Sequence, residues 1–292
     1  MRNDETRSVA PAFVRPPCGV AVALGGGGAR GLAHIVVLEA LDDLGVRPLV
    51  LAGASMGAVV AAAYAAGMTA RDIRAFSLRV LRNRRLLLGR MLEARVGRFT
   101  DILKRGLVNP VLLDAELLLP SFWPDDIPAN FEDLLLPLLV VTTDFNARAQ
   151  LVLQSGDLRS AVAGSMAIPG MVKPVERDGR VLVDGGVVNP LPYEMLFDHA
   201  SVVLACDVSP GRADGQGIAP QPFEAMLGAT QIMQAGLTAR MLRERPPHLV
   251  VHPPVERFRL LDFFYAARIL EAADPCKDAI KRDLAALLET VL

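Results

Sequence analysis

The chain has 292 residues, of which 52% are hydrophobic and 22% are charged, with a mean hydropathy of +0.34. This composition excludes a disordered chain, and the length suffices for one large domain or two ordinary ones. The 31 basic and 32 acidic side chains leave a net charge of −1. Such a balance provides no overall field to attract nucleic acid, so we expect no nucleic-acid partner.

The N-terminal residues and the cysteines indicate the cellular compartment of the protein. Residues 1–17 mix both charge signs without an apolar segment, so we interpret them as a flexible tail and not as a secretory signal. Cys18, Cys206 and Cys276 are widely spaced and form no CxxC pair, which predicts neither a disulfide framework nor a metal site. We expect a cytoplasmic protein, free or peripheral to the inner face of the membrane.

The next part of the chain alternates between strand and helix patterns. Apolar runs at 19–24 and 48–52 predict strands buried on both faces. Helical spacing predicts helices over 32–44 and 58–66. Because alternating strands and helices favour a parallel sheet covered by helices, we expect an α/β fold with three α/β/α layers and a mainly parallel central sheet.

Two later parts of the chain depart from this alternation of strands and helices. Residues 69–136 are helical in pattern and rich in leucine, arginine and proline, so we expect a helical insertion in a catalytic α/β domain over 18–210. Residues 211–292 are expected to form a linker and a helical C-terminal segment that packs on the core. The further strands are predicted at 138–143, 151–154, 180–183 and 201–206, and the further helices at 223–242 and 260–292.

A glycine-rich loop, Gly25–Gly31 (GGGGARG), lies between the first predicted strand and helix. Its bare backbone N–H groups fit either a phosphate site of the GxGxxG kind or an oxyanion hole. A dinucleotide site needs an acidic residue about twenty positions further on, whereas none occurs between Asp43 and Asp72. Nucleotide binding is therefore kept as the weaker alternative.

Gly53–Gly57 (GASMG) is a GxSxG sequence between a predicted strand and an alanine-rich predicted helix. This is the context of a nucleophile elbow, in which a sharp turn exposes the serine and glycines on either side prevent clashes. The pattern indicates that Ser55 is a nucleophile. The structural alternative is a tight turn in which Ser55 caps the helix.

A nucleophilic serine needs a base. Asp184, followed by Gly185 and Gly186, is preferred over the other strand-end carboxylates, Asp144 and Asp207, because its glycines permit close approach. A triad in the order Ser55, Asp184 and then His248 or His252 stays open, since that order occurs in α/β-hydrolases. Neither His248 nor His252 lies in a triad signature. His34, on the predicted helix after the glycine loop, is expected to be structural, and His199 lies just before a predicted strand.

Three motifs in this order, GGGARG at 26–31, GASMG at 53–57 and DGG at 184–186, resemble the patatin-like phospholipases, a family of serine lipid acyl hydrolases. The intervening segment 163–175 (AGSMAIPGMVKPV) is similar to the Ser-x-x-x-Pro stretch that these proteins carry before DGG. The resemblance covers roughly residues 18–210. A regulatory or scaffold protein without activity on the same fold is the remaining alternative.

The resemblance implies a Ser–Asp dyad of Ser55 and Asp184, an oxyanion hole formed by Gly26, Gly27 and Gly28, and a basic loop residue at Arg30. It also implies an esterase of the phospholipase A or lysophospholipase type, which acts on lipid acyl esters through an acyl-enzyme without metal or cofactor. Arg30 is expected to orient the loop or contact a substrate phosphate, with a surface salt bridge as the structural alternative.

Residues 79–98 form a basic segment with seven arginines and a single acidic residue, Glu93. The arginines are interleaved with leucines, so one interpretation is peripheral contact with an anionic membrane. The other is a solvated helix face, the commoner role of a charge run.

Overall fold

The computed structural model describes residues 16–82, 89, 95–96, 112–119, 122–211 and 219–291. Within them, one sheet contains eight strands. These are β1 (Val20–Leu24), β2 (Val50–Ala54), β5 (Leu138–Asp144), β6 (Ala149–Leu153), β7 (Val175–Arg177), β8 (Arg180–Asp184), β9 (Val202–Cys206) and β10 (Leu249–Val251). A two-stranded ribbon pairs β3 (Arg95–Val96) with β4 (Leu112–Leu113).

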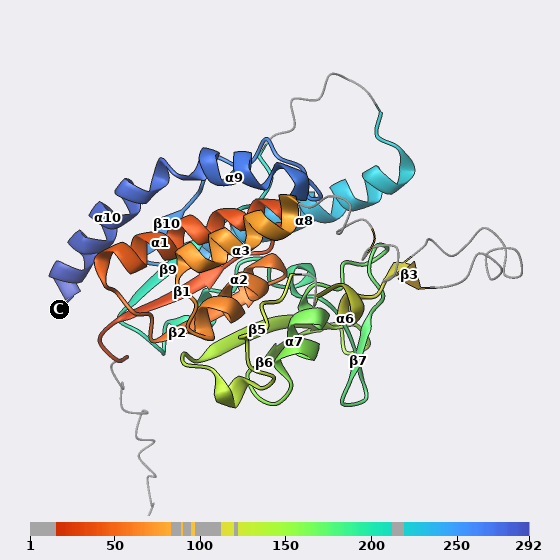
Figure 1. Cartoon of the computed structure of the whole chain (residues 1–292), viewed down its shortest axis with the longest axis horizontal. Helices are drawn as coiled ribbons and strands as arrows, with labels where there is room; N and C mark the ends of the chain where they lie inside the picture. Colours follow the sequence, from red (N-terminus) through yellow and green to blue (C-terminus); the bar gives the residue numbers. More distant parts are fainter. Residues whose placement is uncertain are drawn as a thin grey trace, which may run out of the picture.

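In the first part of the chain, the helices follow the strands in the expected alternation (Figure 1). The α-helices are α1 (His34–Leu44), α2 (Met56–Ala65), α3 (Ala70–Arg82), α6 (Ala115–Leu118), α7 (Leu158–Ser165), α8 (Pro222–Glu244), α9 (Ala266–Ala273) and α10 (Cys276–Val291). The 3-10 helices are η1 (Gly28–Ala33), η3 (Phe131–Asp133), η4 (Gly185–Val187), η5 (Glu194–Leu196) and η6 (Phe263–Tyr265).

The central sheet is mainly parallel. Its order is β10-β9-β1-β2-β5-β8-β7; the pairs from β10 to β5 are parallel, while β8 and β6 pair antiparallel with β5, and β7 with β8. The parallel strands β1, β2 and β9 are buried along their whole length, as strands covered on both faces must be. The carboxyl ends of β1 and β2 therefore lie side by side at one edge, where ligands bind in open α/β sheets.

Two apolar layers cover the sheet. One contains side chains of α1, α2, α3, α7, α9 and α10, which gather on one face. The other is smaller and consists of residues 191–200, with η5, and the C-terminal end of α8, whose Met241 and Leu242 pack on it. The expected α/β/α architecture is thus confirmed, although the second face is covered by short elements.

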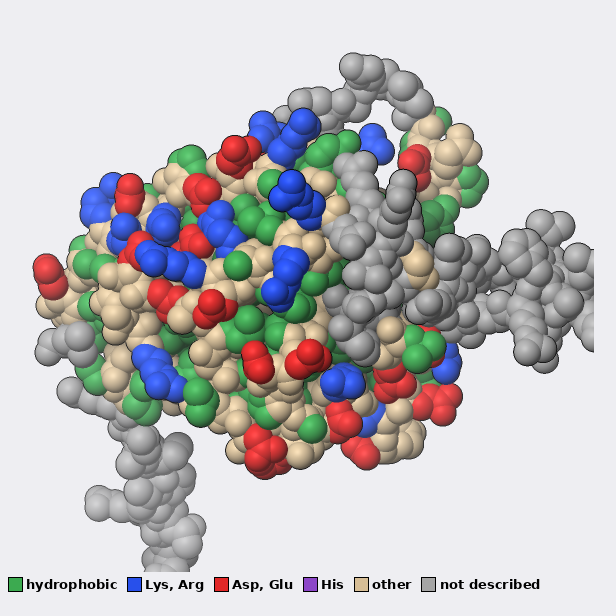
Figure 2. Space-filling view, in the orientation of Figure 1, with side chains coloured by type: hydrophobic (Ala, Val, Ile, Leu, Met, Phe, Trp, Pro, Cys, Tyr) green, Lys and Arg blue, Asp and Glu red, His purple; other side chains and the backbone are tan. Residues whose placement is uncertain are grey.

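The expected helix over 260–292 is divided into η6, α9 and α10. Pro275 follows α9, and proline does not continue a helix because it lacks an N–H donor. An ion-pair network fixes this region to the first helices: Arg74 of α3 binds Glu39 of α1 at 2.6 Å and also Asp274. Figure 2 shows blue and red side chains intermixed over this face of the molecule.

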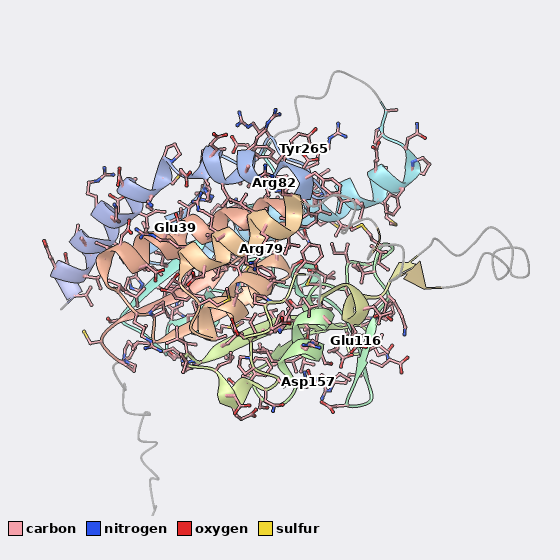
Figure 3. All side chains as sticks on the ribbon, viewed as in Figure 1. Glu39, Arg79, Arg82, Glu116, Asp157 and Tyr265 are labelled. Carbon is pink, nitrogen blue, oxygen red and sulfur yellow. The ribbon has the colours of Figure 1, made fainter. Side chains whose placement is uncertain are left out.

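Several expectations lie partly outside the described residues. Only Pro16 and Pro17 of the expected tail belong to the described part of the chain. Within the expected helical insertion, α3 and α6 are helical, whereas β3 and β4 form an unexpected ribbon. Of the seven arginines in the basic segment 79–98, only Arg79 and Arg82 have described side chains; both are exposed near the end of α3 (Figure 3). The domain division stays a prediction.

None of the helices in the described ranges is long and apolar enough to cross a membrane.

Candidate active site

Ser55 lies on a sharp turn between β2 and α2, with φ of 54° and ψ of −124°. A non-glycine residue rarely adopts positive φ, and such strain persists only where the surroundings enforce it. The flanking glycines explain how the turn fits. A Cβ at Gly57 would lie 2.1 Å from the Leu24 carbonyl oxygen, and one at Gly53 would lie 2.6 Å from the Ala58 backbone. The GxSxG sequence therefore forms the predicted elbow.

Ser165, at the end of α7, stabilises this turn through two hydrogen bonds. Its hydroxyl accepts a hydrogen bond from the Ser55 N–H at 2.8 Å and donates one to the Val141 carbonyl at 2.6 Å. Ser165 is fully buried, so each of these bonds is shielded from water. Ser165 is the serine of the Ser-x-x-x-Pro stretch in segment 163–175, but its contact with Ser55 was not predicted, because no local pattern reveals a contact across 110 residues.

Asp184 ends β8 and meets Ser55 directly. The Ser55 hydroxyl donates to Oδ2 of Asp184 at 2.7 Å, and the Gly186 N–H donates to Oδ1 at 2.7 Å. Close approach requires the neighbouring glycine, since a Cβ at Gly185 would lie 2.1 Å from the Val141 carbonyl oxygen. The two residues that sequence motifs single out as nucleophile and base are thus brought within hydrogen-bond distance.

Burial makes the Asp184 carboxylate a stronger base than an exposed one. Only 5% of the residue is exposed, and this desolvation raises its pKa to about 6, although the hydrogen bonds from Ser55 and Gly186 act in the opposite direction. An exposed aspartate has a pKa of about 3.9. At neutral pH the carboxylate is therefore mostly ionised, and it accepts a proton more readily than the carboxylate of an exposed aspartate does.

The glycine-rich loop lies beside Ser55. A Cβ at Gly26 would lie 3.5 Å from the Ser55 Cβ, and one at Gly28 would lie 2.3 Å from the Leu260 carbonyl oxygen. The Gly26 N–H already donates to the Pro190 carbonyl at 2.9 Å, which departs from the expected trio of free donors. The N–H groups of Gly27 and Gly28 donate to no acceptor within the described part of the chain. These two amides are available to an anionic oxygen.

Arg30 is 2% exposed, so it forms no surface salt bridge. Its guanidinium donates three hydrogen bonds, to the Val208 carbonyl at 2.9 Å, the Phe258 carbonyl at 3.0 Å and Oε1 of Gln231 at 3.2 Å. Burial lowers its pKa to about 10, which still leaves it charged at neutral pH. The contacts join η1, which begins within the loop, to the segment after β9, to α8 and to the segment before η6.

A small pocket surrounds these groups, with about 30 Å³ of free space, on the order of one or two water molecules. Ser55, Asp184 and the loop form its base, and the polar side chains of α8 form its roof. The complete lining is Gly26, Gly27, Gly28, Ser55, Ile168, Pro169, Asp184, Val187, Leu227, Thr230, Gln231, Gln234 and Leu260. The contribution of α8 was not foreseen from the sequence.

None of the four histidines, all of which are described, contacts Ser55. Nδ1 of His248 accepts from the Val203 N–H at 2.9 Å, and His252 lies 3.5 Å from Asp207. Nε2 of His34 lies 2.7 Å from the Gly25 carbonyl, so it carries the proton and donates. Burial lowers the pKa of His34 to about 4, which keeps its ring neutral. His199 is exposed.

The other two strand-end carboxylates have local partners. Asp144 accepts from the Asn146 and Ala147 N–H groups and from Arg180, and the pKa of Asp144 is lowered, chiefly by the Ala147 N–H bond. Asp207 accepts from the Ser209 N–H at 2.8 Å. No group of three metal-binding side chains gathers in the described ranges.

Comparisons with known proteins agree with these motifs. A sequence model of the family described as Patatin-like phospholipase matches residues 22–197. An uncharacterized NTE family protein of Mycobacterium tuberculosis (strain H37Rv) is 34% identical over 232 residues, which cover 77% of this chain and 60% of that protein. Human patatin-like phospholipase domain-containing protein 6 is 32% identical over 195 residues, covering 65% of this chain and 13% of that protein.

Solved structures show a more distant similarity. VipD from Legionella pneumophila aligns over 94% of this chain and 67% of that chain, with a TM-score of 0.47 and 14% identity. Human GIVD cytosolic phospholipase A2 aligns over 93% of this chain and 60% of that chain, with a TM-score of 0.44 and 12% identity.

Proposed function

Because the chain belongs to the patatin-like phospholipase family, we propose that it is a serine esterase that hydrolyses acyl esters of lipids, a phospholipase A or lysophospholipase activity. The observation that carries the proposal is the 2.7 Å hydrogen bond from the Ser55 hydroxyl to the buried Asp184 carboxylate, beside two free backbone amides. Ser55 is the nucleophile and Asp184 is the base.

Acylation begins when Oδ2 of Asp184 takes the hydroxyl proton of Ser55 and Oγ attacks the ester carbonyl carbon. The carbonyl oxygen becomes an oxyanion, which accepts hydrogen bonds from the Gly27 and Gly28 N–H groups. Such preorganised donors stabilise the developing charge, and losing one typically costs about 3 kcal/mol of barrier. The tetrahedral intermediate then expels the alcohol, which takes the proton back from Asp184, and leaves an acyl group on Ser55.

Deacylation repeats these steps with water as the nucleophile. Asp184 takes a proton from a water molecule, whose oxygen attacks the acyl carbon, and the same amides bind the second oxyanion. Collapse of this intermediate releases the fatty acid and returns the proton to Ser55. Arg30 acts as a positioning residue, because its hydrogen bonds fix the short helix η1, which begins within the glycine loop.

The surroundings favour this dyad over the alternatives. His248 and His252 have other partners, so a triad would require one of them to move to Ser55. The glycine loop borders Ser55 at close range, which favours an oxyanion hole over a nucleotide phosphate site. Contact of residues 79–98 with an anionic membrane remains a separate proposal, supported by the exposed Arg79 and Arg82.

The decisive experiment is labelling with a fluorophosphonate probe, which reacts with activated serines, followed by peptide mapping and assay of a soluble short-chain ester. We expect the label on Ser55, and we expect Ser55→Ala to lower the hydrolysis rate at least about 1,000-fold, because it removes the nucleophile. Ser155→Ala changes an exposed serine and serves as the matched control, with unchanged rate. Full activity in folded Ser55→Ala contradicts the proposal.

A second set of variants separates the dyad from a triad. Asp184→Ala should lower the rate about as severely as Ser55→Ala, whereas His248→Ala and His252→Ala should retain most of the activity. A loss in either histidine variant as large as that in Asp184→Ala, with the fold intact by circular dichroism, contradicts the dyad.

A further inference from the structure

Helix α8 exposes apolar side chains to solvent although it turns several polar ones inward. Thr230, Gln231 and Gln234 line the Ser55 pocket together with Leu227, and Thr238 is buried. The side chains between the two charged ends of the helix that face solvent are apolar. They are Ala225, Met226, Ala229, Ile232, Met233 and Ala239, and Phe223 lies exposed just before them. A surface helix in water normally turns a polar or charged face to solvent.

The outer face of α8 is an uncharged strip. No charged residue occurs between Glu224 and Arg240. Ile232 is 74% exposed and Met233 is 66% exposed, and Phe223 and Met226 are each 44% exposed near the start of the helix. Figure 2 shows this end of α8, at the upper right, as a mainly green and tan surface. A contiguous apolar surface of this kind marks a contact with a partner or a lipid.

The same helix closes the Ser55 pocket. The free space of about 30 Å³ in this pocket is far too small for a lipid acyl chain, so part of its lining must move before such a substrate reaches Ser55, and α8 supplies four of the lining residues. The attachment of α8 permits it to move. Among the described residues, the bond between Gln231 and Arg30 is the only side-chain hydrogen bond that joins α8 to a residue beyond its own N-cap, Gln221. Met241 and Leu242 anchor the opposite end in the core.

We propose that α8 is an interfacial lid, whose outer face binds the surface of a lipid bilayer and thereby uncovers Ser55. This inference rests on the proposed function, since it assumes that the substrate is part of a lipid aggregate. Lipid takes up Ile232 and Met233, which water solvates poorly, and the helix end nearest Phe223 leaves the pocket while the end at Met241 stays packed.

The size of the strip favours a lipid surface over a second copy of the chain. Fifteen helical residues span about 22 Å, and a helix is about 10 Å wide. The strip therefore offers on the order of 200 Å², well below the roughly 800 Å² per partner of a stable protein interface. An amphipathic helix needs no such minimum at a lipid interface, where affinity grows with the buried apolar area.

The first measurement is co-flotation of the full chain with vesicles of ether-linked phosphatidylcholine, which contain no ester to hydrolyse. The double variant Ile232→Gln/Met233→Gln should bind about tenfold or more weakly, because two exposed apolar side chains no longer enter the lipid. Leu135→Gln is the matched control: Leu135 is 62% exposed, beside the end of α2 remote from Ser55, and this variant should float like the parent. Equal binding of the parent and the double variant overturns the inference.

The second measurement is the rate of fluorophosphonate labelling at Ser55 with and without these vesicles. We expect the vesicles to accelerate labelling of the parent and of Leu135→Gln about tenfold, and the double variant to keep the unstimulated rate. Labelling that is equally fast with and without vesicles overturns the lid while the proposed function stands. Absence of labelling under every condition contradicts the proposed function instead, and flotation still decides whether the strip binds lipid.

Sedimentation velocity of the same proteins tests whether a second copy of the chain, and not lipid, covers the apolar strip of α8. A parent dimer that the double variant converts to monomer, together with no vesicle binding, overturns the inference in favour of a contact between copies.

Discussion

At the scale of single residues, burial destabilises the charged form of the Asp184 carboxylate, and the proposed mechanism uses this charged form as the base. The carboxylate is buried, and the favourable hydrogen bonds from Ser55 and Gly186 do not compensate fully for lost hydration, so its pKa is raised to about 6. The carboxylate accepts a proton only when it is ionised. The working range of the site therefore begins above a pH of about 6, where the protein also carries the cost of the buried charge.

The sign of this cost gives a prediction for Asp184→Asn. A group whose pKa is higher in the folded than in the unfolded chain stabilises the fold at low pH, and this contribution is lost as pH rises from about 4 to about 6. The amide cannot ionise, so Asp184→Asn should be more stable than the parent above pH 6 by up to about 3 kcal/mol. Urea unfolding at pH 4.5 and pH 8 measures the difference.

The comparison at the two pH values supplies its own control. The gain in unfolding free energy should be small at pH 4.5, where the parent carboxyl is largely protonated, and should appear at pH 8. A variant that is equally or less stable than the parent at both values would show that the Asp184 carboxylate is not destabilised by burial.

At the scale of elements, local patterns predicted well wherever an element is buried and regular. The strands β1, β2, β5, β8 and β9 and the helices α1, α2 and α8 lie where their hydrophobic patterns predict them, within a few residues. The three-residue strands β7 and β10 are too short for a periodic signal, and only pairing with β8 and β9 makes them strands. The eight-residue α7 was missed for a similar reason.

The sequence predicted those parts of the candidate site that glycine motifs mark. Glycines mark where backbone passes close to backbone, so the elbow and the Asp184 turn leave a sequence signal. Ser165 and the roof from α8 depend on contacts between distant segments, which no local pattern encodes. The Gly26 amide differs from expectation because Pro190, 164 positions further along, supplies its acceptor.

Substitution of Arg30 tests how the elements around the glycine-rich loop are joined. Replacing it by methionine leaves the Val208 and Phe258 carbonyls and Gln231 without their donor, at about 1–3 kcal/mol for each buried group. Arg30→Met should therefore lower the melting temperature and the rate of ester hydrolysis, and Arg30→Lys should restore part of both. Thermal unfolding and steady-state kinetics measure these effects.

The choice of substrate decides between the two sequence-based interpretations of Arg30. A positioning role lowers kcat equally for a neutral short-chain ester and for a phospholipid, since it acts through the oxyanion loop. A loss confined to KM for phosphate-bearing substrates would instead show that Arg30 contacts the phosphate, against the three backbone and side-chain contacts seen here.

At the scale of the whole molecule, the matched family region 22–197 does not contain all of the core. The C-terminal elements contribute β10 to the sheet, and α9 and α10 pack on the first helices. Glu39 illustrates the connection: it is 6% exposed and binds Arg74, while Lys277 of α10 lies 3.6 Å away. The α/β domain and the C-terminal segment thus share one apolar layer.

A chain that ends at residue 265 should therefore fail to fold. It lacks α9 and α10, whose Ile269, Leu270, Ile280 and Leu284 are at most 3% exposed. Burying such a side chain contributes about 1.5–3 kcal/mol, so the four together approach the 5–15 kcal/mol by which a domain is typically stable. A chain that ends at Leu288 keeps all four side chains and is the matched control. Soluble expression and urea unfolding followed by circular dichroism compare the two, and a cooperative transition of the shorter chain at the midpoint of the control would show that the C-terminal helices are dispensable for the fold.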